Sequence, residues 1–341
     1  MSRILILGGT RNLGHVAATH LMECGHTVAV LNRGITPDEL PAEIERIRAT
    51  RGTGMLQSAV GSRDFDLILD LTTYNRDDAI EAVQAFRGKA KRYVFISSGQ
   101  VYLVRDGAHR PFQEDHYAGG LMIPPASGTS DFESWKYGAD KRDAEEVFNA
   151  AWADERFPVT TLRLPMVASH RDSYGRIQGY LARLFDGGPI LIPDEEGLPI
   201  RHVYVNDVAR VIALMCDSSS GIGGAFNISF GQSMFLRDYL TMLGNIAGKD
   251  PATVRAPRTE LETKLLLPDC SPFSGTWMSE LDGSRAGREL IRGDFEYSRP
   301  EEYLAAIVDD YRDRWVRHGV VPATYRQRGR ELAFARNQQF R

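Results

Sequence analysis

The chain has 341 residues, of which 43% are hydrophobic and 25% are charged, and its formal net charge is -4 at pH 7. This length suits one α/β core of roughly 200 to 250 residues with an added lobe, and the composition excludes a disordered chain. Because Asp and Glu outnumber Lys and Arg by 45 to 41, no global positive field is available to hold a polyanion. A nucleic-acid partner is therefore not expected.

The three cysteines, Cys24, Cys216 and Cys270, are widely spaced and have no CxxC or His-x-Cys neighbours. They predict reduced thiols rather than a disulfide framework or a zinc site, and no metal site is expected. The apolar stretch at residues 4–7 is much shorter than the core of a signal peptide, and no apolar run reaches the roughly 18 residues of a membrane span. We expect a cytoplasmic protein with no membrane partner.

Short apolar runs alternate with helix-length segments along much of the chain. Strands are expected at residues 4–7, 27–31, 44–49, 67–71, 93–96 and 159–164, with helices between them such as 77–86 and 136–153. This alternation is typical of an α/β fold, a doubly wound parallel sheet of the Rossmann type. After a turn-rich stretch, a strand at 202–205 and a helix at 208–216 return to the same pattern.

After residue 165 the sequence becomes rich in turn-forming residues, and this change predicts two parts that are interleaved along the chain. A dinucleotide-binding Rossmann domain is expected at residues 1–164 and 201–228, a substrate-binding lobe at 165–200 and 229–320, and a basic C-terminal tail at 321–341. Residues 322–341 hold five arginines and one glutamate. We interpret the tail as a solvated helix that packs Leu332 and Phe334, and a nucleic-acid arm is the alternative.

A glycine-rich segment, Leu-Gly-Gly-Thr-Arg-Asn-Leu-Gly from Leu7 to Gly14, lies between the first expected strand and the first expected helix. Glycines there let the backbone approach a pyrophosphate, and the helix N-terminus supplies free N–H groups and the positive end of a dipole. The pattern predicts a dinucleotide-binding turn, and a tight turn without a ligand is the alternative.

The second strand ends in Asn32 and Arg33, where a cofactor with a free 2'-hydroxyl usually meets Asp or Glu. Asn32 carries no charge to repel a 2'-phosphate, and Arg33 can pair with one. This favours NADP over NAD. If Arg33 is only a solvated loop arginine, NAD remains open.

Ser98 follows the fifth expected strand, and Tyr137 precedes Lys141 by four residues within an expected helix. This spacing puts Tyr137 and Lys141 on one helix face. A cation beside a tyrosine favours the phenolate, so that the tyrosine can exchange a proton with a carbonyl or carbinol oxygen. The Ser98 hydroxyl can orient the same oxygen.

With the glycine turn, the strand end Ser-Ser-Gly-Gln-Val-Tyr at residues 97–102 and this Tyr-Lys pair, the chain resembles the extended short-chain dehydrogenase/reductase family. This is the group of epimerases, dehydratases and reductases that act on sugar-like substrates. The resemblance covers roughly residues 1–315 and includes Arg163-Leu-Pro165, residues 202–207 and Ala225-Phe-Asn227. The family pattern assigns Ser98, Tyr137 and Lys141 to catalysis.

The resemblance also implies which residues hold the cofactor, at the ends of successive strands. They are Gly8, Thr10, Asn12 and Leu13 in the turn, Asn32 and Arg33 after strand two, Leu71 and Thr72 after strand four, and Leu164 and Pro165 after strand six. Arg11 replaces the central glycine of the family, as in its divergent GGTRxLG branch. It either reaches a cofactor phosphate or only covers the site.

Two departures from the family pattern bear on the substrate. The nucleotide-sugar enzymes hold a diphosphate with an Asn and an Arg at positions that are Met166 and Ile200 here. Arg201 is adjacent, but a shift of one residue along a strand turns a side chain to the opposite face unless a bulge restores it. The dehydratases have Asp-Glu where this chain has Gly99-Gln100, so elimination of water by that route is not expected. The reaction that remains expected is hydride exchange at one carbon of the substrate.

The substrate pocket is the least determined part of the site. The residues expected to contact the substrate are Gln100, Tyr102, Met166, Tyr174, Arg176 and Tyr204, and packing alone is the alternative for Tyr174, Arg176 and Tyr204. The segment 103–134 is expected to form a lid over the substrate.

The leading hypothesis is an NADP-dependent oxidoreductase that interconverts a secondary alcohol and a ketone on a polar, sugar-like or natural-product small molecule. A nucleotide-sugar epimerase with rearranged diphosphate contacts is one alternative, and a non-catalytic or RNA-binding protein on the same fold is another. The resemblance further implies a homodimer, with Ala79, Val83, Phe86, Val147 and Phe148 as expected contacts.

Overall fold

The structure is a computed structural model that describes residues 1–52, 54–195, 197–291, 293–319 and 321–339. It divides into two compact units. Unit 1 comprises residues 1–166, 205–231 and 279–297, and unit 2 comprises residues 167–204, 232–278 and 298–341. Residues 340 and 341 of the expected tail lie outside the described residues.

A seven-stranded parallel sheet forms the centre of unit 1, which confirms the expected α/β fold class. The strand order is β10-β6-β5-β4-β1-β2-β3. The strands are β1 (Arg3–Leu7), β2 (Thr27–Asn32), β3 (Glu45–Arg48), β4 (Phe65–Asp70), β5 (Ala90–Ser98), β6 (Val159–Leu164) and β10 (Ala225–Asn227). Because the chain order reverses beside β1, the carboxyl ends of β1 and β4 define the crevice where ligands bind in such sheets.

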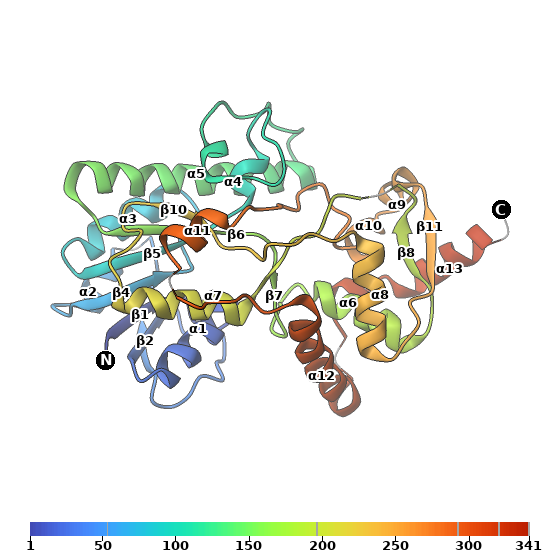
Figure 1. Cartoon of the computed structure of the whole chain (residues 1–341), viewed down its shortest axis with the longest axis horizontal. Coiled ribbons are helices and arrows are strands. Elements are labelled where there is room, and N and C mark those ends of the chain that lie inside the picture. Colours follow the sequence, from blue (N-terminus) through green and yellow to red (C-terminus); the bar gives the residue numbers. More distant parts are fainter. Residues whose placement is uncertain (53, 196, 292, 320, 340–341) are drawn as a thin grey trace. The chain divides into compact units, whose positions relative to one another are not determined.

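Helices cover both faces of this sheet, with α3 and α5 over one face and α1 and α7 over the other (Figure 1). This explains why almost every residue of β1, β4 and β6 is buried on both faces of the sheet. The helical segments of unit 1 are α1 (Asn12–Glu23), α2 (Met55–Val60), α3 (Arg76–Phe86), α4 (Gln100–Leu103), η1 (Glu114–Tyr117), α5 (Ser130–Glu155), α7 (Val205–Leu214), η2 (Met215–Asp217) and α11 (Ser284–Glu289).

Helix α5 begins six residues before the expected start at 136. The Thr129 hydroxyl accepts a hydrogen bond from the Phe132 backbone N–H at 3.1 Å, and acidic residues occupy the first turn. This cap satisfies an N–H that has no partner within the helix and so favours the earlier start.

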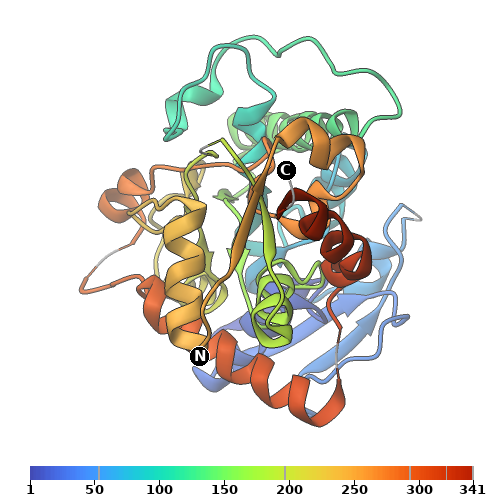
Figure 2. The same cartoon turned by 90° about the vertical axis from the view of Figure 1, so that its right-hand side faces the viewer.

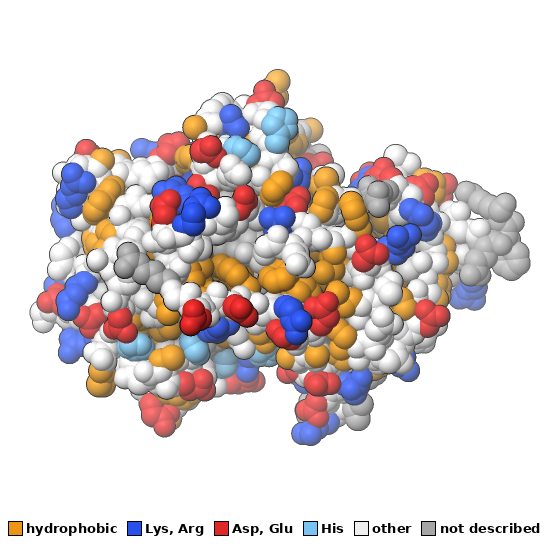
Figure 3. Space-filling view, in the orientation of Figure 1, with side chains coloured by type: hydrophobic (Ala, Val, Ile, Leu, Met, Phe, Trp, Pro, Cys, Tyr) orange, Lys and Arg blue, Asp and Glu red, His pale blue; other side chains and the backbone are white. Residues whose placement is uncertain are grey.

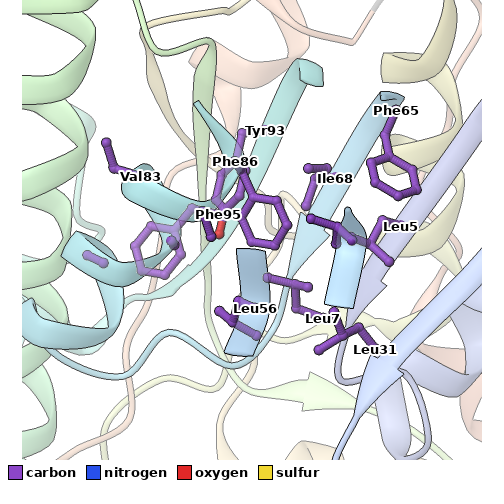
Figure 4. Packing of buried hydrophobic residues seen from close by; sticks show 14 of the residues in the cluster. Leu5, Leu7, Leu31, Leu56, Phe65, Ile68, Val83, Phe86, Tyr93 and Phe95 are labelled. Atoms are coloured by element: carbon purple, nitrogen blue, oxygen red, sulfur yellow. The ribbon is translucent and has the colours of Figure 1, made fainter. Parts of the chain in front are cut away.

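The residues expected to form a dimer contact lie in the core of unit 1, between the sheet and helices α3 and α5. Ala79, Val83, Phe86 and Phe148 are all buried, and Val147 packs partly against the same cluster. Figure 4 shows part of this core, in which aromatic side chains such as Phe86 and Tyr93 lie among aliphatic ones. The assignment of Ala79, Val83, Phe86 and Phe148 to a dimer contact is therefore wrong, because they bury the sheet of their own chain, whereas the homodimer itself stays a prediction.

Unit 2 is mixed and contains two short parallel strand pairs, β8 with β11 and β7 with β9. Figure 2 shows β8 and β11 side by side, with α8 on one side and α13 on the other. Its elements are β7 (Val167–Ala168), α6 (Arg176–Asp186), β8 (Ile190–Pro193), β9 (Val203–Tyr204), α8 (Leu236–Ala247), β11 (Thr253–Ala256), α9 (Arg258–Thr263), α10 (Leu267–Cys270), α12 (Pro300–His318), η3 (Ala323–Tyr325) and α13 (Arg328–Gln339).

Two expectations about the division of the chain are corrected by the structure. The strand expected at 202–205 is β9, which pairs with β7 in unit 2, and the seventh strand of the main sheet is β10 instead. Residues 279–297, expected in the substrate lobe, belong to unit 1. Phe112 N–H donates to the Glu280 carbonyl at 2.7 Å, and Leu281 is buried against Val101 and Phe112.

The C-terminal segment is an integral part of unit 2 rather than a separate tail. Phe334 lies in a buried apolar cluster with Leu191 and Leu261. Arg328, one of the five arginines of this segment, pairs with Asp186 at 2.6 Å, so its positive charge is neutralised within unit 2. On the face shown in Figure 3, Lys and Arg side chains are interspersed with Asp and Glu. Within the described residues, none of the helices is both long enough and apolar enough to cross a membrane.

Candidate active site

The turn between β1 and α1 has a backbone that only glycine fits. Gly8 and Gly9 have φ angles of +104° and +92°, in the region that side chains disfavour. A Cβ at Gly9 would lie 2.6 Å from Val30 Cγ1, and one at Gly14 would lie 2.7 Å from the Gly9 Cα. The absence of side chains therefore lets helix α1 approach the end of β1 closely.

The N-terminus of α1 is open toward this turn. Arg11 is the N-cap residue, and within the described chain its side chain makes no capping hydrogen bond. The Asn12 Oδ1 atom is buried and has no partner among the described residues. Thr10 is half-buried, and Leu13 is buried inside the helix. A glycine cradle, free helix N–H groups and an unpartnered amide oxygen together fit a pyrophosphate with its ribose.

At the end of β2, the Asn32 side chain organises the following loop. Its Nδ2 donates to the Gly8 carbonyl at 3.4 Å, and its Oδ1 accepts from the Gly34 N–H at 2.9 Å. Arg48, at the end of β3, also donates to this Oδ1. Sequence reasoning missed Arg48. Its position opposite Asn32 follows from the parallel pairing of β3 with β2, which the motifs do not reveal.

Three arginines thus converge on the loop after β2. Arg11 Nη2 donates to the Thr36 hydroxyl at 3.1 Å, Arg33 is exposed, and Arg48 lies beside Asn32. Because the carboxyl ends of parallel strands share one edge of the sheet, these positive charges are concentrated where the adenosine ribose of a dinucleotide binds.

Leu71 and Thr72, after β4, lie against the glycine turn, and their contact with a cofactor stays a prediction. A Cβ at Gly8 would lie 3.1 Å from Thr72 Cγ2, and one at Gly14 would lie 2.9 Å from Leu71 Cδ1. At the end of β6, the Leu164 carbonyl accepts a hydrogen bond from the Gly99 N–H at 2.8 Å, which places Leu164 beside the Ser98 turn. Pro165 and Met166 follow and are buried.

Lys141 is buried at the inner face of α5, with 3% of its surface exposed. Its Nζ donates to the Thr73 carbonyl at 2.6 Å and to the Ile96 carbonyl at 2.9 Å. Burial lowers the pKa of Lys141 to about 8, against the charge of Asp70, which raises it. Tyr137, one turn earlier on the same helix, keeps 36% of its surface exposed.

A close contact joins α5, next to Tyr137, to the start of α4, which follows Ser98. A Cβ at Gly138 would lie 2.6 Å from the Gln100 carbonyl oxygen, so the glycine after Tyr137 allows α5 to touch the turn that follows Ser98. Ser98 Oγ accepts from the Gln100 N–H at 3.2 Å, which leaves the hydroxyl proton available to a ligand. Gln100 itself is half-buried.

Tyr102 is not a pocket residue, contrary to the sequence-based expectation. It is fully buried and stacked on Phe112, and its hydroxyl donates to Asn227 Oδ1 at 2.8 Å and accepts from Arg163 Nη1 at 2.7 Å. Arg163 in turn pairs with Glu145 at 2.6 Å. Burial raises the pKa of Tyr102, and its hydroxyl belongs to an internal network that joins β6, α5 and β10.

Part of the segment expected to act as a lid is bonded into unit 1. Glu114 Oε1 accepts from the Asn227 N–H at 2.8 Å, and Asn227 Nδ2 donates to the Phe112 carbonyl at 2.9 Å. Arg142 of α5 donates to the Tyr117 carbonyl at 2.9 Å. Residues 112–117 are therefore anchored to the sheet and to α5.

The remaining substrate candidates lie in unit 2. Tyr174 is 70% exposed, and Arg176 pairs with Asp172 at 3.0 Å. Tyr204 is nearly buried and stacks on Tyr303 with ring centroids 5.3 Å apart, so its ring serves packing within unit 2.

Unit 1 has a Rossmann-type α/β fold, with a glycine turn after its first strand. Residues 70–229 match the family model described as the NAD dependent epimerase/dehydratase family. The matched residues, less than half of the chain, are similar to this family, as the sequence motifs indicate, and the family's description names NAD as its cofactor.

Two curated relatives and many solved structures are similar to the chain. It is 28% identical to the 2'-dehydrokanamycin reductase of Streptomyces kanamyceticus over 227 residues, which is 64% of this chain and 60% of that protein. It is also 28% identical to the chloroplast stem-loop binding protein of 41 kDa b of Arabidopsis thaliana over 118 residues, 30% of this chain and 31% of that one. The matches thus span less than two thirds of either relative.

Among solved structures, the UDP-N-acetylglucosamine 4-epimerase of Methanobrevibacter ruminantium superposes with a TM-score of 0.71 at 16% identity. The match covers 92% of this chain and 99% of that one. At this identity the similarity establishes the fold alone.

Proposed function

We propose that the protein is an NADP-dependent oxidoreductase that interconverts a ketone and a secondary alcohol on a polar, sugar-like or natural-product substrate. Support comes from the relative whose name states a reduction, the 2'-dehydrokanamycin reductase, which matches the chain over 64% of its length. Further support comes from unit 1, which contains both the glycine cradle after β1 and the Tyr-Lys pair on α5.

The observation that carries this proposal is the buried Lys141 four residues after Tyr137 on α5. The Lys141 ammonium favours the phenolate of Tyr137, so Tyr137 can donate a proton to a ketone oxygen and take it back from an alcohol. The Ser98 hydroxyl accepts a hydrogen bond from the Gln100 N–H, so its own proton can still be donated. We expect it to donate this proton in a hydrogen bond to the same ketone or alcohol oxygen. The 36% of the Tyr137 surface that is exposed supports access of a substrate to this residue.

The residues present fit a nicotinamide dinucleotide. Gly8, Gly9 and the N-terminus of α1 would hold the pyrophosphate, and Leu71 and Thr72 flank that turn. Lys141 would hold a ribose hydroxyl in addition to its two carbonyls, since an ammonium has three donors. When bound in its reduced form, the cofactor supplies a hydride to the substrate carbon.

Substitution of Tyr137 by Phe tests the acid/base role. NADPH oxidation, followed by absorbance with a panel of keto-aminoglycosides and keto-sugars, should fall by about 100-fold or more in Tyr137→Phe, while NADPH binding persists. Tyr74→Phe is a matched control, because the Tyr74 ring lies 5.2 Å from Lys141 Nζ and the variant keeps that ring. Retained turnover in Tyr137→Phe, or its loss only in Tyr74→Phe, would refute the assignment.

The preference for NADP rests on the arginines after β2 and β3. Arg33, which is exposed, and Arg48, beside Asn32, could each pair with a 2'-phosphate, and Asn32 carries no opposing charge. A hydrogen bond to a charged group contributes about 1.5 to 3 kcal/mol, so each arginine should account for roughly tenfold or more in affinity.

Fluorescence titration with NADPH and NADH tests this preference. Arg33→Ala and Arg48→Ala should weaken NADPH binding by about tenfold or more and leave NADH binding nearly unchanged. Arg63→Ala is the control, because Arg63 pairs with Glu45 at the opposite end of β3. Tighter binding of NADH than NADPH by the unaltered protein would contradict the proposal.

The alternatives from the sequence receive less support. For a nucleotide-sugar epimerase, Ile200 is buried in a bridge with Met234, and Arg201 donates to the Ser233 hydroxyl at 2.8 Å. For an RNA-binding protein, Arg328 of the C-terminal helix is engaged with Asp186. A nucleoside diphosphate copurifying with the protein, or salt-dependent RNA retention, would revive the respective alternative.

A further inference from the structure

The carboxylate of Asp70, at the end of β4, is fully buried and saturated with hydrogen bonds. Oδ1 accepts from the Thr72 and Thr73 N–H groups at 2.7 and 3.1 Å, and Oδ2 accepts from the hydroxyls of Thr73 and Tyr93. Arg51 Nη2 donates to Oδ2 at 2.9 Å and to the Thr72 hydroxyl at 3.1 Å. Burial alone would raise the pKa of Asp70, but Arg51 and these donors hold it below its usual range.

The same loop leads directly to Lys141. Asp70 binds both the N–H and the hydroxyl of Thr73, and the Thr73 carbonyl accepts from Lys141 Nζ at 2.6 Å. The Asp70 carboxylate thus sets the orientation of the Thr73 carbonyl, because it holds the N–H and the hydroxyl of the same residue. Since Lys141 has only 3% of its surface exposed, it depends on such acceptors in place of water.

The charges that act on Lys141 come from four elements. Asp70 of β4, Glu145 of α5 and Asp78 of α3 favour its ammonium form, whereas Arg51, from the loop after β3, opposes it. Asp70 and Arg51 therefore act on Lys141 in opposite senses, although they are bonded to each other.

We propose that Asp70, held by Arg51, is a positioning residue that fixes the Thr73 carbonyl and supplies the buried negative charge that keeps Lys141 in its working state beside Tyr137. The inference rests on the proposed function of Lys141, but the contact and the charge that it invokes exist without any substrate. No feature of the sequence motifs distinguishes Asp70 from an ordinary strand residue.

The test is the titration of Lys141 in the protein without cofactor or substrate. The chain has six lysines, at positions 89, 91, 136, 141, 249 and 264, so lysine labelled with ¹³C at Cε gives few resonances. Lys141→Arg identifies the resonance that belongs to position 141. In the unaltered protein this resonance should titrate near pH 8.

Two variants should move this titration in opposite directions. Asp70→Asn removes the negative charge and should lower the pKa of Lys141 by about one unit, and Arg51→Gln should raise it by a similar amount. Tyr93→Phe is the control, because it removes one hydrogen bond to Asp70 and leaves both charges in place, so the titration should stay near its original value. A general loosening of the core would instead move all three variants the same way.

Shifts of the same sign in Asp70→Asn and Arg51→Gln, or no shift in either, would overturn the proposal. If Asp70→Asn fails to fold, Arg51→Gln decides alone, since an unchanged or lowered pKa of Lys141 in that variant contradicts the role. The failure of the proposed function is read separately, from turnover in Tyr137→Phe. A normal Lys141 titration with no turnover dependence on Tyr137 would leave Asp70 as described and refute the acid/base assignment.

Discussion

We expect His202 to make the stability of unit 2 dependent on pH. Its ring has 3% of its surface exposed and packs against Phe273 and Tyr239, with centroids 4.6 and 5.6 Å away. Within the described residues neither ring nitrogen has a hydrogen-bond partner. Burial, with a smaller contribution from Arg176, lowers the pKa of His202 from 6.5 to about 3.

The magnitude follows from the difference between the two pKa values. Because the folded pKa of His202 is depressed, the unfolded chain binds the proton first, so stability is present above pH 6.5 and is lost as the pH falls toward 3. Each unit in this window costs about 1.4 kcal/mol. Between pH 7 and pH 5 the free energy of unfolding should therefore fall by about 2 kcal/mol through this residue alone.

Urea unfolding at pH 7, 6 and 5 measures this effect by comparison with His202→Phe. The phenyl ring keeps the aromatic contacts and buries no nitrogen, so the variant should lose about 2 kcal/mol less than the unaltered protein over this range. The other histidines cancel in the difference. His109→Gln, at an exposed position, is the control and should follow the unaltered protein. Parallel pH profiles for His202→Phe and the unaltered protein would refute the reasoning.

Two further predictions concern unit 1. Gly14→Ala places a Cβ 2.7 Å from backbone in the phosphate turn and should weaken dinucleotide binding by about tenfold or more by fluorescence titration; Gly287→Ala, where a Cβ meets open space, should bind normally. Glu145→Ala leaves Arg163 buried without its carboxylate and should cost about 3 to 5 kcal/mol in urea unfolding. Glu155→Ala removes an ion pair of the same 2.6 Å length at the surface and should cost less than about 1 kcal/mol. Equal costs for the two glutamates would show that burial does not govern them.

The sequence by itself determined the class of fold and the places where the site begins. Apolar runs that end in glycine or polar residues depend only on local periodicity, and in a parallel sheet all such ends meet at one edge. The glycine turn, the position of Ser98 and the i, i+4 relation of Tyr137 and Lys141 are therefore readable along the chain. For the same reason the family could be recognised from short motifs.

The tertiary structure decided which side chains share an environment. The sequence predicts Tyr102 as a pocket residue, but its hydroxyl is hydrogen-bonded to Arg163 and Asn227 inside unit 1. Arg48 contacts Asn32 because β3 pairs with β2. In the sequence, Asp70 resembles any carboxylate at the end of a strand. Only the structure shows that Asp70 binds Thr73 and that the Thr73 carbonyl accepts a hydrogen bond from Lys141.

Segments far apart in sequence also had to be located by packing. Residues 279–297 join unit 1 although they lie beyond the last strand of its sheet, because Phe112 and Asn227 bond to Glu280 and Asp282. His202 is neutral because Tyr239 and Phe273 enclose it. Burial, charge and hydrogen-bond partners arise from contacts across long stretches of chain, whereas periodicity and spacing arise from neighbours, and only the latter can be read from the sequence alone.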